Sequence, residues 1–168
     1  MATWINKKGI HLTMRDLTEK IAIQAPPHAV WEVLEDFGAV SEWAPYMRKS
    51  YLVGDQKTGV GTSRFMRHAW GFGIEELVTE WTDGHGFCFD VHRAPFPMKD
   101  VHETWVTSHD SGLSTVATRV TYSMRLGFLG ILVDWMLVRF VVRREMRAGL
   151  LGLKKYVESK SNLIPQES

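Results

Sequence analysis

Three things are scarce in this chain: cysteine, an excess of one charge, and uninterrupted apolar sequence. Cys88 is the single cysteine among 168 residues, which excludes an internal disulfide and favours a reducing compartment. The 20 Lys and Arg residues nearly balance the 19 Asp and Glu residues, giving a net charge of +1. No broad basic surface is therefore expected, and we predict no nucleic-acid partner.

We expect no segment of this sequence to cross a membrane or to direct secretion. Residues 128–142 are its most apolar stretch, but Asp134 and Arg139 interrupt it, whereas a spanning helix needs about 20 apolar residues. Residues 1–13 contain no apolar core of a signal peptide. We expect a cytoplasmic protein, with peripheral contact with a membrane left open. Its divisions would be an extension over residues 1–14, a single domain over 15–160 and a tail over 161–168.

Recognised catalytic and cofactor motifs are missing too. The chain has no nucleophile elbow, no phosphate-binding loop and no dinucleotide fingerprint, so no cofactor is predicted. His85, His92, His102 and His109 gather in one hairpin region, where His92 and His102 could be cross-strand neighbours near Asp90. Two His and one Asp can bind zinc, but no zinc motif is present and this face is expected to meet solvent. We predict no metal site.

What the sequence does contain is a series of strands followed by one long helix. Alternation predicts a first strand over 17–25, and a proline pair then opens a short helix over 30–37. A further helical turn is expected over 39–45. Turn residues separate six more strands, at 46–54, 59–69, 72–82, 86–93, 99–109 and 113–126. Connections this short imply antiparallel pairing.

Residues 128–158 are interpreted as one amphipathic helix. The apolar residues that recur every three or four positions are Phe128, Ile131, Trp135, Val138, Val142, Met146, Leu150, Leu153 and Val157. This stripe must pack against the sheet, because neither surface is stable in water alone. One helix on one curved sheet leaves space between them, and a binding site is expected in that space.

The order of these elements, with five short stretches, resembles the SRPBCC superfamily, whose members share the helix-grip fold. The similar group within it is polyketide cyclase/dehydrase and lipid transport, which includes the coenzyme Q-binding proteins. The stretches are Ile23–Phe37, Trp43–Pro45, Gly59–Arg64, Val120–Gly127 and Leu150–Tyr156. The resemblance implies an α+β fold. In it, a seven-stranded antiparallel sheet wraps around the long C-terminal helix, with two short helices between strands 1 and 2.

The resemblance also implies an internal cavity, which in this superfamily commonly holds lipids, quinones or polyketides. A hairpin that turns through Pro95–Pro97 would set Phe89 opposite Trp105 and Val91 opposite Glu103. The predicted ligand-binding residues are Phe87, Phe89, Val91, Trp105, Val120, Tyr122, Met124, Trp135, Val142 and Met146. A solid core of the same side chains is the alternative.

Four polar residues within the predicted strands are candidates for chemistry: Arg64, Glu103, Arg119 and Tyr122. Regular pairing would bring Glu103 close to Arg119, either as a surface ion pair or as a polar anchor for a ligand. Polyketide aromatase/cyclases of this fold are thought to use an inward arginine and aromatic hydroxyls. That resemblance makes Arg64 and Tyr122 the positions to test for catalysis.

The exterior of the long helix is apolar as well. The residues off its core stripe include Leu129, Val133, Met136, Leu137, Phe140 and Val141. Four arginines accompany them, at Arg139, Arg143, Arg144 and Arg147. Such a surface usually contacts something. A membrane surface, a second copy of the chain or the protein's own loops could each cover the 128–147 region.

These features leave three hypotheses for function. The first is a non-catalytic protein that binds or transports a hydrophobic small molecule such as a lipid, quinone or polyketide-like compound. The second is an aromatase/cyclase or dehydratase acting in the same cavity, and the third is an interaction module that uses the apolar helix exterior. Two convergent titratable groups in the cavity would favour the enzyme, and a single polar anchor would favour the carrier.

Overall fold

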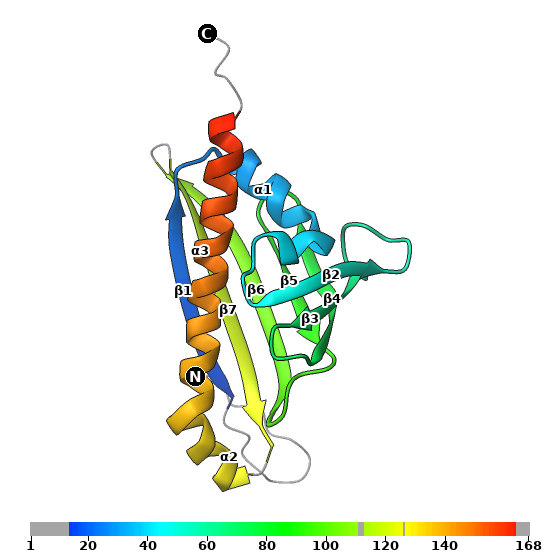
Figure 1. Cartoon of the computed structure of the whole chain (residues 1–168), viewed down its shortest axis with the longest axis vertical. Helices are drawn as coiled ribbons and strands as arrows, with labels where there is room; N and C mark the ends of the chain where they lie inside the picture. The colour runs from blue at the N-terminus through cyan, green and yellow to red at the C-terminus, as the bar shows by residue number, and fades with distance from the viewer. Residues whose placement is uncertain (1–13, 111–112, 126, 164–168) are drawn as a thin grey trace.

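The computed structural model describes residues 14–110, 113–125 and 127–163, and it shows a long helix lying across one face of a single sheet (Figure 1). Most of the predicted extension and tail lies outside these residues. So do the side chains of two members of the predicted stripe, Phe128 and Ile131.

The sheet has seven strands in the order β1-β7-β6-β5-β4-β3-β2, and every neighbouring pair is antiparallel. The strands are β1 Arg15–Ile23, β2 Met47–Val53, β3 Ser63–His68, β4 Gly73–Thr82, β5 Gly86–Val91, β6 Met98–Asp110 and β7 Leu113–Met124. Strands β2 to β7 pair in chain order, as their short connections require. The strand β1 joins β7 at the far edge, so the predicted seven-stranded antiparallel sheet is confirmed.

Two short helices connect β1 to β2, as predicted: α1 Pro27–Glu35 and η1 Phe37–Glu42. Pro27 occupies the first turn of α1, where the missing amide hydrogen costs nothing. The helix α1 buries four residues, Val30, Trp31, Val33 and Leu34. They join a core that includes Phe37, Phe89 and Leu153.

The C-terminal helical region is continuous but not uniform. It consists of α2 Gly127–Val133, a π-helical turn η2 Asp134–Val138, and α3 Arg139–Leu163. The helix α3 packs closely on the segment between η1 and β2, because Gly152 lies against the Trp43 carbonyl and Gly149 against the Tyr46 hydroxyl. A β-carbon at either glycine would collide with these groups. This contact holds Tyr46 at the edge of the space beneath the helix.

The π-helical turn overturns one part of the predicted stripe. Trp135 is 63% exposed, whereas Asp134 is 2% exposed and Val138 is 8% exposed. A π-turn accommodates one extra residue, so the positions before Val138 rotate relative to a regular helix. The inward position is therefore taken by Asp134. It accepts a hydrogen bond from the Tyr122 hydroxyl and pairs with Arg15 at 2.7 Å.

The pairing of β5 with β6 differs from the predicted register by two residues. Phe89 lies opposite Glu103, Phe87 opposite Trp105, and Val91 opposite Val101. A shift of two preserves the face of every side chain, so Phe89 and Trp105 still point toward the helix. The connection between β5 and β6 thus differs from the predicted turn, but the same side chains of β5 and β6 face the helix.

Candidate ligand pocket

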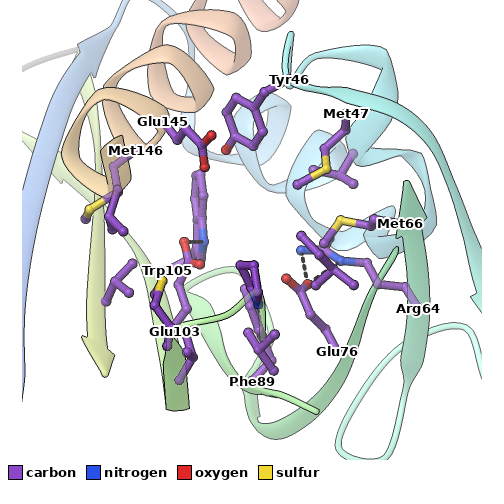
Figure 2. A pocket seen from close by; sticks show the side chains of 18 of the residues that line it. Tyr46, Met47, Arg64, Met66, Glu76, Phe89, Glu103, Trp105, Glu145 and Met146 are labelled. Atoms are coloured by element: carbon purple, nitrogen blue, oxygen red, sulfur yellow. Dashed lines mark hydrogen bonds and ion pairs between the residues drawn. The ribbon is translucent and has the colours of Figure 1, made fainter. Parts of the chain in front are cut away.

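A cavity of about 130 Å³ lies between the concave face of the sheet and α3 (Figure 2). Its walls come from η1, from strands β2 to β7 and from the first turns of α3. Twenty residues line it: Val40, Trp43, Tyr46, Met47, Arg64, Met66, Phe72, Ile74, Glu76, Phe89, Val91, Pro95, Met98, Val101, Glu103, Trp105, Val120, Val142, Glu145 and Met146.

The volume decides what the pocket can enclose. An engineered apolar cavity of roughly 150 Å³ holds one benzene molecule, whereas sites for drug-sized ligands span about 300–1,000 Å³. A cavity of about 130 Å³ therefore encloses one ring or a short chain segment. A fused polyketide would not fit inside it as it stands.

Six of the ten predicted ligand-binding residues lie on the pocket wall: Phe89, Val91, Trp105, Val120, Val142 and Met146. The other four do not line it. Phe87 packs deeper, stacked on Trp81 at 5.4 Å. Tyr122 and Met124 belong to a second apolar cluster under the beginning of the helical region. Trp135 faces outward because of the π-turn.

A buried ion pair forms one side of the pocket. Arg64 on β3 and Glu76 on β4 lie opposite each other in the sheet, and the Arg64 Nε is 2.6 Å from Glu76 Oε2. Arg64 also donates to the Phe37 carbonyl at 2.9 Å, and its guanidinium lies 3.7 Å from the centre of the Phe37 ring. Burial raises the pKa of Glu76, and the positive charge of Arg64 opposes that rise.

Glu103 on β6 presents a carboxyl group from the opposite side of the pocket (Figure 2). Its Oε1 accepts hydrogen bonds from Trp105 Nε1 at 2.7 Å and from the Thr118 hydroxyl at 2.8 Å. Both bonds from the described residues end on Oε1, which leaves Oε2 for a ligand. Burial, with a smaller contribution from the negative charge of Glu76, raises the pKa of Glu103 to about 7.

Tyr46 and Glu145 lie above the pocket in Figure 2. The buried His68 completes this third polar group, with its ring centre 5.9 Å from that of Tyr46. The Trp70 amide donates to His68 Nδ1 at 3.1 Å, so the proton of the neutral ring lies on Nε2. That nitrogen is 3.1 Å from Glu145 Oε1 on α3. Burial raises the pKa values of both Tyr46 and Glu145, while His68 opposes the rise at Glu145.

The four catalytic candidates separate into two groups. Arg64 and Glu103 line the pocket. Arg119 lies opposite Thr104 rather than beside Glu103, and its guanidinium points to the outer face, where Nε donates to Asp16 at 2.9 Å. Tyr122 is fully buried and bonded to Asp134, away from the pocket wall. The expected approach of Glu103 to Arg119 is therefore wrong.

Sequence reasoning left Tyr46, Glu76 and Glu145 out of the predicted site. A usable signal existed for Glu76, because its parity on β4 is that of the buried Ile74 and Val78. No comparable signal marks Tyr46, since the close approach of α3 to the segment before β2 places it. The histidine cluster also differs from expectation, because Asp90 lies opposite His102 and binds its Nδ1 at 2.7 Å.

The arrangement combines an apolar chamber with carboxyl groups that hold or release a proton. Glu76 is paired with Arg64 and Glu145 with His68, each through one oxygen, whereas Glu103 forms no ion pair with a described residue and is held only by Trp105 and Thr118. A group of this kind donates a hydrogen bond when protonated and accepts one when ionised. Within the described part of the chain, no three His, Cys, Asp or Glu side chains gather to hold a metal ion.

The family model "Polyketide cyclase / dehydrase and lipid transport" matches residues 14–158. The chain belongs to this family. Its fold is the helix grip, with the sheet and long C-terminal helix expected from the resemblance. No curated protein matches the chain.

Solved structures support the same fold at low sequence identity. XoxI from Bacillus cereus is 19% identical with a TM-score of 0.70, and the alignment covers 87% of this chain and 97% of XoxI. The di-domain ARO/CYC protein BexL is 19% identical with a TM-score of 0.71, and the alignment covers 86% of this chain and 50% of BexL. Ara h 8.0201 is 13% identical with a TM-score of 0.67, and the alignment covers 88% of this chain and 99% of Ara h 8.0201.

Proposed function

We propose that this family member binds a hydrophobic small molecule in the pocket, with one ring or short chain enclosed and a hydroxyl or carbonyl directed at Glu103. The observation that carries the proposal is the apolar hollow of about 130 Å³, on whose wall Trp105 and Thr118 hold the Glu103 carboxyl by one oxygen and leave Oε2 facing a ligand. Apolar contact supplies the affinity, at about 25 cal/mol per Å² buried. The carboxyl selects which end of the ligand enters.

Three aromatic probes of nearly equal size test this proposal: toluene, p-cresol and p-toluate. We expect p-cresol to bind best, because its hydroxyl can hydrogen-bond to Glu103. One such bond tightens binding about threefold to tenfold over toluene. The anion p-toluate should bind worst, since Glu103 and Glu145 line the pocket and the only lining arginine, Arg64, is already paired with Glu76.

Binding is measured by NMR titration at the indole N–H of Trp105, which donates to Glu103. Phe89→Ala should weaken p-cresol binding, because Phe89 lies on the wall. Val116→Ala is the matched control, since Val116 is equally buried but does not line the pocket. Absence of binding by all three probes, or equal losses in the two variants, would contradict the proposal.

A second function, acid–base catalysis on the bound ring, is favoured by Glu103 alone. Its pKa of about 7 suits a group that both takes up and releases a proton near neutral pH. Trp105 and Thr118 hold the carboxyl in place, and Tyr46 lies on the same pocket wall. A cyclase or dehydratase would therefore use Glu103, with the paired Arg64 and Glu76 on the opposite side of the pocket.

Exchange of substrate protons separates the enzyme from the carrier. We would incubate 4-methylcyclohexenone in deuterated water and follow deuterium uptake next to its carbonyl by NMR. Exchange that the wild type accelerates and Glu103→Gln abolishes supports catalysis. Binding of the ketone without accelerated exchange by the wild type supports the carrier alone.

A further inference from the structure

Six large apolar side chains stand exposed along the beginning of the C-terminal helical region. They form what is called the apolar patch: Leu129, Leu132, Trp135, Met136, Leu137 and Phe140. Each is between 45% and 64% exposed. Scattered exposed apolar residues are ordinary, but a contiguous set within twelve residues marks a contact surface.

The fold fixes this patch outward rather than leaving it to collapse onto the core. Asp134 at the start of η2 is held by Arg15 of β1 and by the Tyr122 hydroxyl of β7. With Asp134 pointing inward, the next three residues of the π-turn point outward. The exposed state of Trp135 therefore follows from a buried polar anchor.

Charge around the apolar patch is mostly positive. Residues 125–147 contain five arginines and two acidic residues, Asp134 and Glu145. Both acids are already engaged, Asp134 with Arg15 and Glu145 with His68. Among the residues that the structure describes, Arg139 and Arg144 form no ion pair with a carboxylate.

This charge distribution distinguishes between the two external partners that could cover the patch, a second copy of the chain and a lipid bilayer. A second copy of the chain would bring two arginine-rich fringes together, with no free acid between them to pair with. An anionic bilayer offers the complementary charge, and helices that lie in its interface carry tryptophan, phenylalanine and leucine on their apolar face. No helix of the described residues is long and apolar enough to span a bilayer, so contact would be with the surface.

We propose that the apolar patch and the arginines Arg139 and Arg144 dock this protein on the surface of an anionic lipid bilayer. The patch adjoins the pocket, because Val142 and Glu145, just beyond it on α3, lie on the pocket wall. Trp70, 66% exposed, borders a neighbouring groove that Val141 and Arg144 share. A docked molecule would therefore present its pocket near the lipid. Docking itself does not require the pocket to be occupied.

Cosedimentation with vesicles tests the proposal directly. The wild type should bind vesicles of phosphatidylcholine mixed with phosphatidylglycerol and bind pure phosphatidylcholine far less. Each arginine near a charged surface contributes roughly a factor of five, so Arg139→Gln with Arg144→Gln should weaken binding about thirtyfold. Trp135→Ala with Phe140→Ala should weaken it at least about tenfold through lost apolar insertion.

Matched variants on β2, at the sheet edge opposite β1, control for non-specific effects. Arg48→Gln with Lys49→Gln removes two exposed cations, and Tyr51→Ala with Val53→Ala removes two exposed apolar side chains. Both should leave vesicle binding within about twofold of the wild type. Circular dichroism confirms that each variant is folded.

Three results would overturn the proposal. These are absence of binding to anionic vesicles by folded wild type, equal loss of binding in the β2 variants, and a concentration-dependent dimer that the patch variants dissolve without any vesicle binding. The p-cresol titration is independent of all three, so failure of docking and failure of ligand binding remain distinguishable.

Discussion

At the residue scale, the pocket owes its chemistry to charged side chains at positions where strand parity would place an apolar one. Glu76 lies between the inward-facing Ile74 and Val78 on β4. Glu103 shares its face with Trp105 on β6. Each carboxyl is costly to bury without partners, and the structure supplies those partners. A charge in an apolar row is thus a sequence signal for a site.

Because the pKa of Glu103 is raised in the folded protein, we expect this residue to make the protein less stable as the pH rises. The folded carboxyl holds its proton up to about pH 7, whereas an ordinary glutamate releases it near 4.5. The free energy of unfolding should therefore fall as pH rises through this window, by up to about 3 kcal/mol from this group. Urea denaturation at a series of pH values measures it.

The matched variant for this prediction is Glu103→Gln, whose amide oxygen can still accept the bonds from Trp105 and Thr118. Its unfolding free energy should vary less between pH 4.5 and 7 than that of the wild type. Glu76 and Glu145, whose pKa values are also raised, remain in both proteins, so the comparison isolates Glu103. Identical pH profiles would show that Glu103 titrates normally.

Arg64 should be needed for stability because Glu76 is buried beside it. Arg64→Met leaves an uncompensated buried carboxylate and should cost about 3–5 kcal/mol. The double variant Arg64→Met with Glu76→Leu removes both charges and should recover most of that loss. Chemical denaturation of the set checks this, and a double variant as unstable as the single one would argue that packing, not charge, dominates.

At the scale of elements, periodicity predicted each strand and the long helix but not the local irregularity inside the helix. The stripe from Val138 to Val157 faces the sheet as predicted, and all of its members are buried except the half-buried Val142. The positions before it rotate because Asp134 finds partners on β1 and β7. A sequence period cannot reveal that exchange, since it depends on partners on other elements, and one of them, Arg15, is more than a hundred positions away.

Asp134 should hold the beginning of the helical region onto the sheet. Asp134→Ala leaves the Tyr122 hydroxyl buried without its partner, which typically costs about 1–3 kcal/mol. Amide hydrogen exchange should accelerate over η2 while β4 and β5 stay protected. The control is Asp16→Ala, which removes an exposed ion pair with Arg119 and should cost at most about 1 kcal/mol. Uniform acceleration across the sheet would contradict a local anchor.

At the scale of the whole molecule, the sequence and its resemblance predicted the sheet, the helix and the space between them. Six of the predicted wall residues were found because strand and helix faces follow from alternation and period. The remaining wall depends on how separate elements meet. Tyr46 reaches the pocket only because α3 packs against it through Gly149. Such contacts between distant segments leave no local pattern.

Filling the cavity should abolish binding without harming the fold. Val142 on α3 is half-buried and lies on the pocket wall, so Val142→Phe places a ring in the volume that a ligand would occupy. We expect p-cresol affinity to fall at least about tenfold with little change in melting temperature. Val106→Phe adds the same ring at an exposed position on β6 and should leave affinity unchanged.

The central claim is that an apolar hollow beneath α3 admits a ring whose polar end meets Glu103. A crystal structure of the protein soaked with p-cresol tests it most directly. The account predicts one p-cresol among Phe89, Trp105 and Met146, with its hydroxyl within hydrogen-bond distance of Glu103 Oε2. A pocket closed by its own side chains at saturating p-cresol, or a ring bound with its hydroxyl turned away from Glu103, would contradict it.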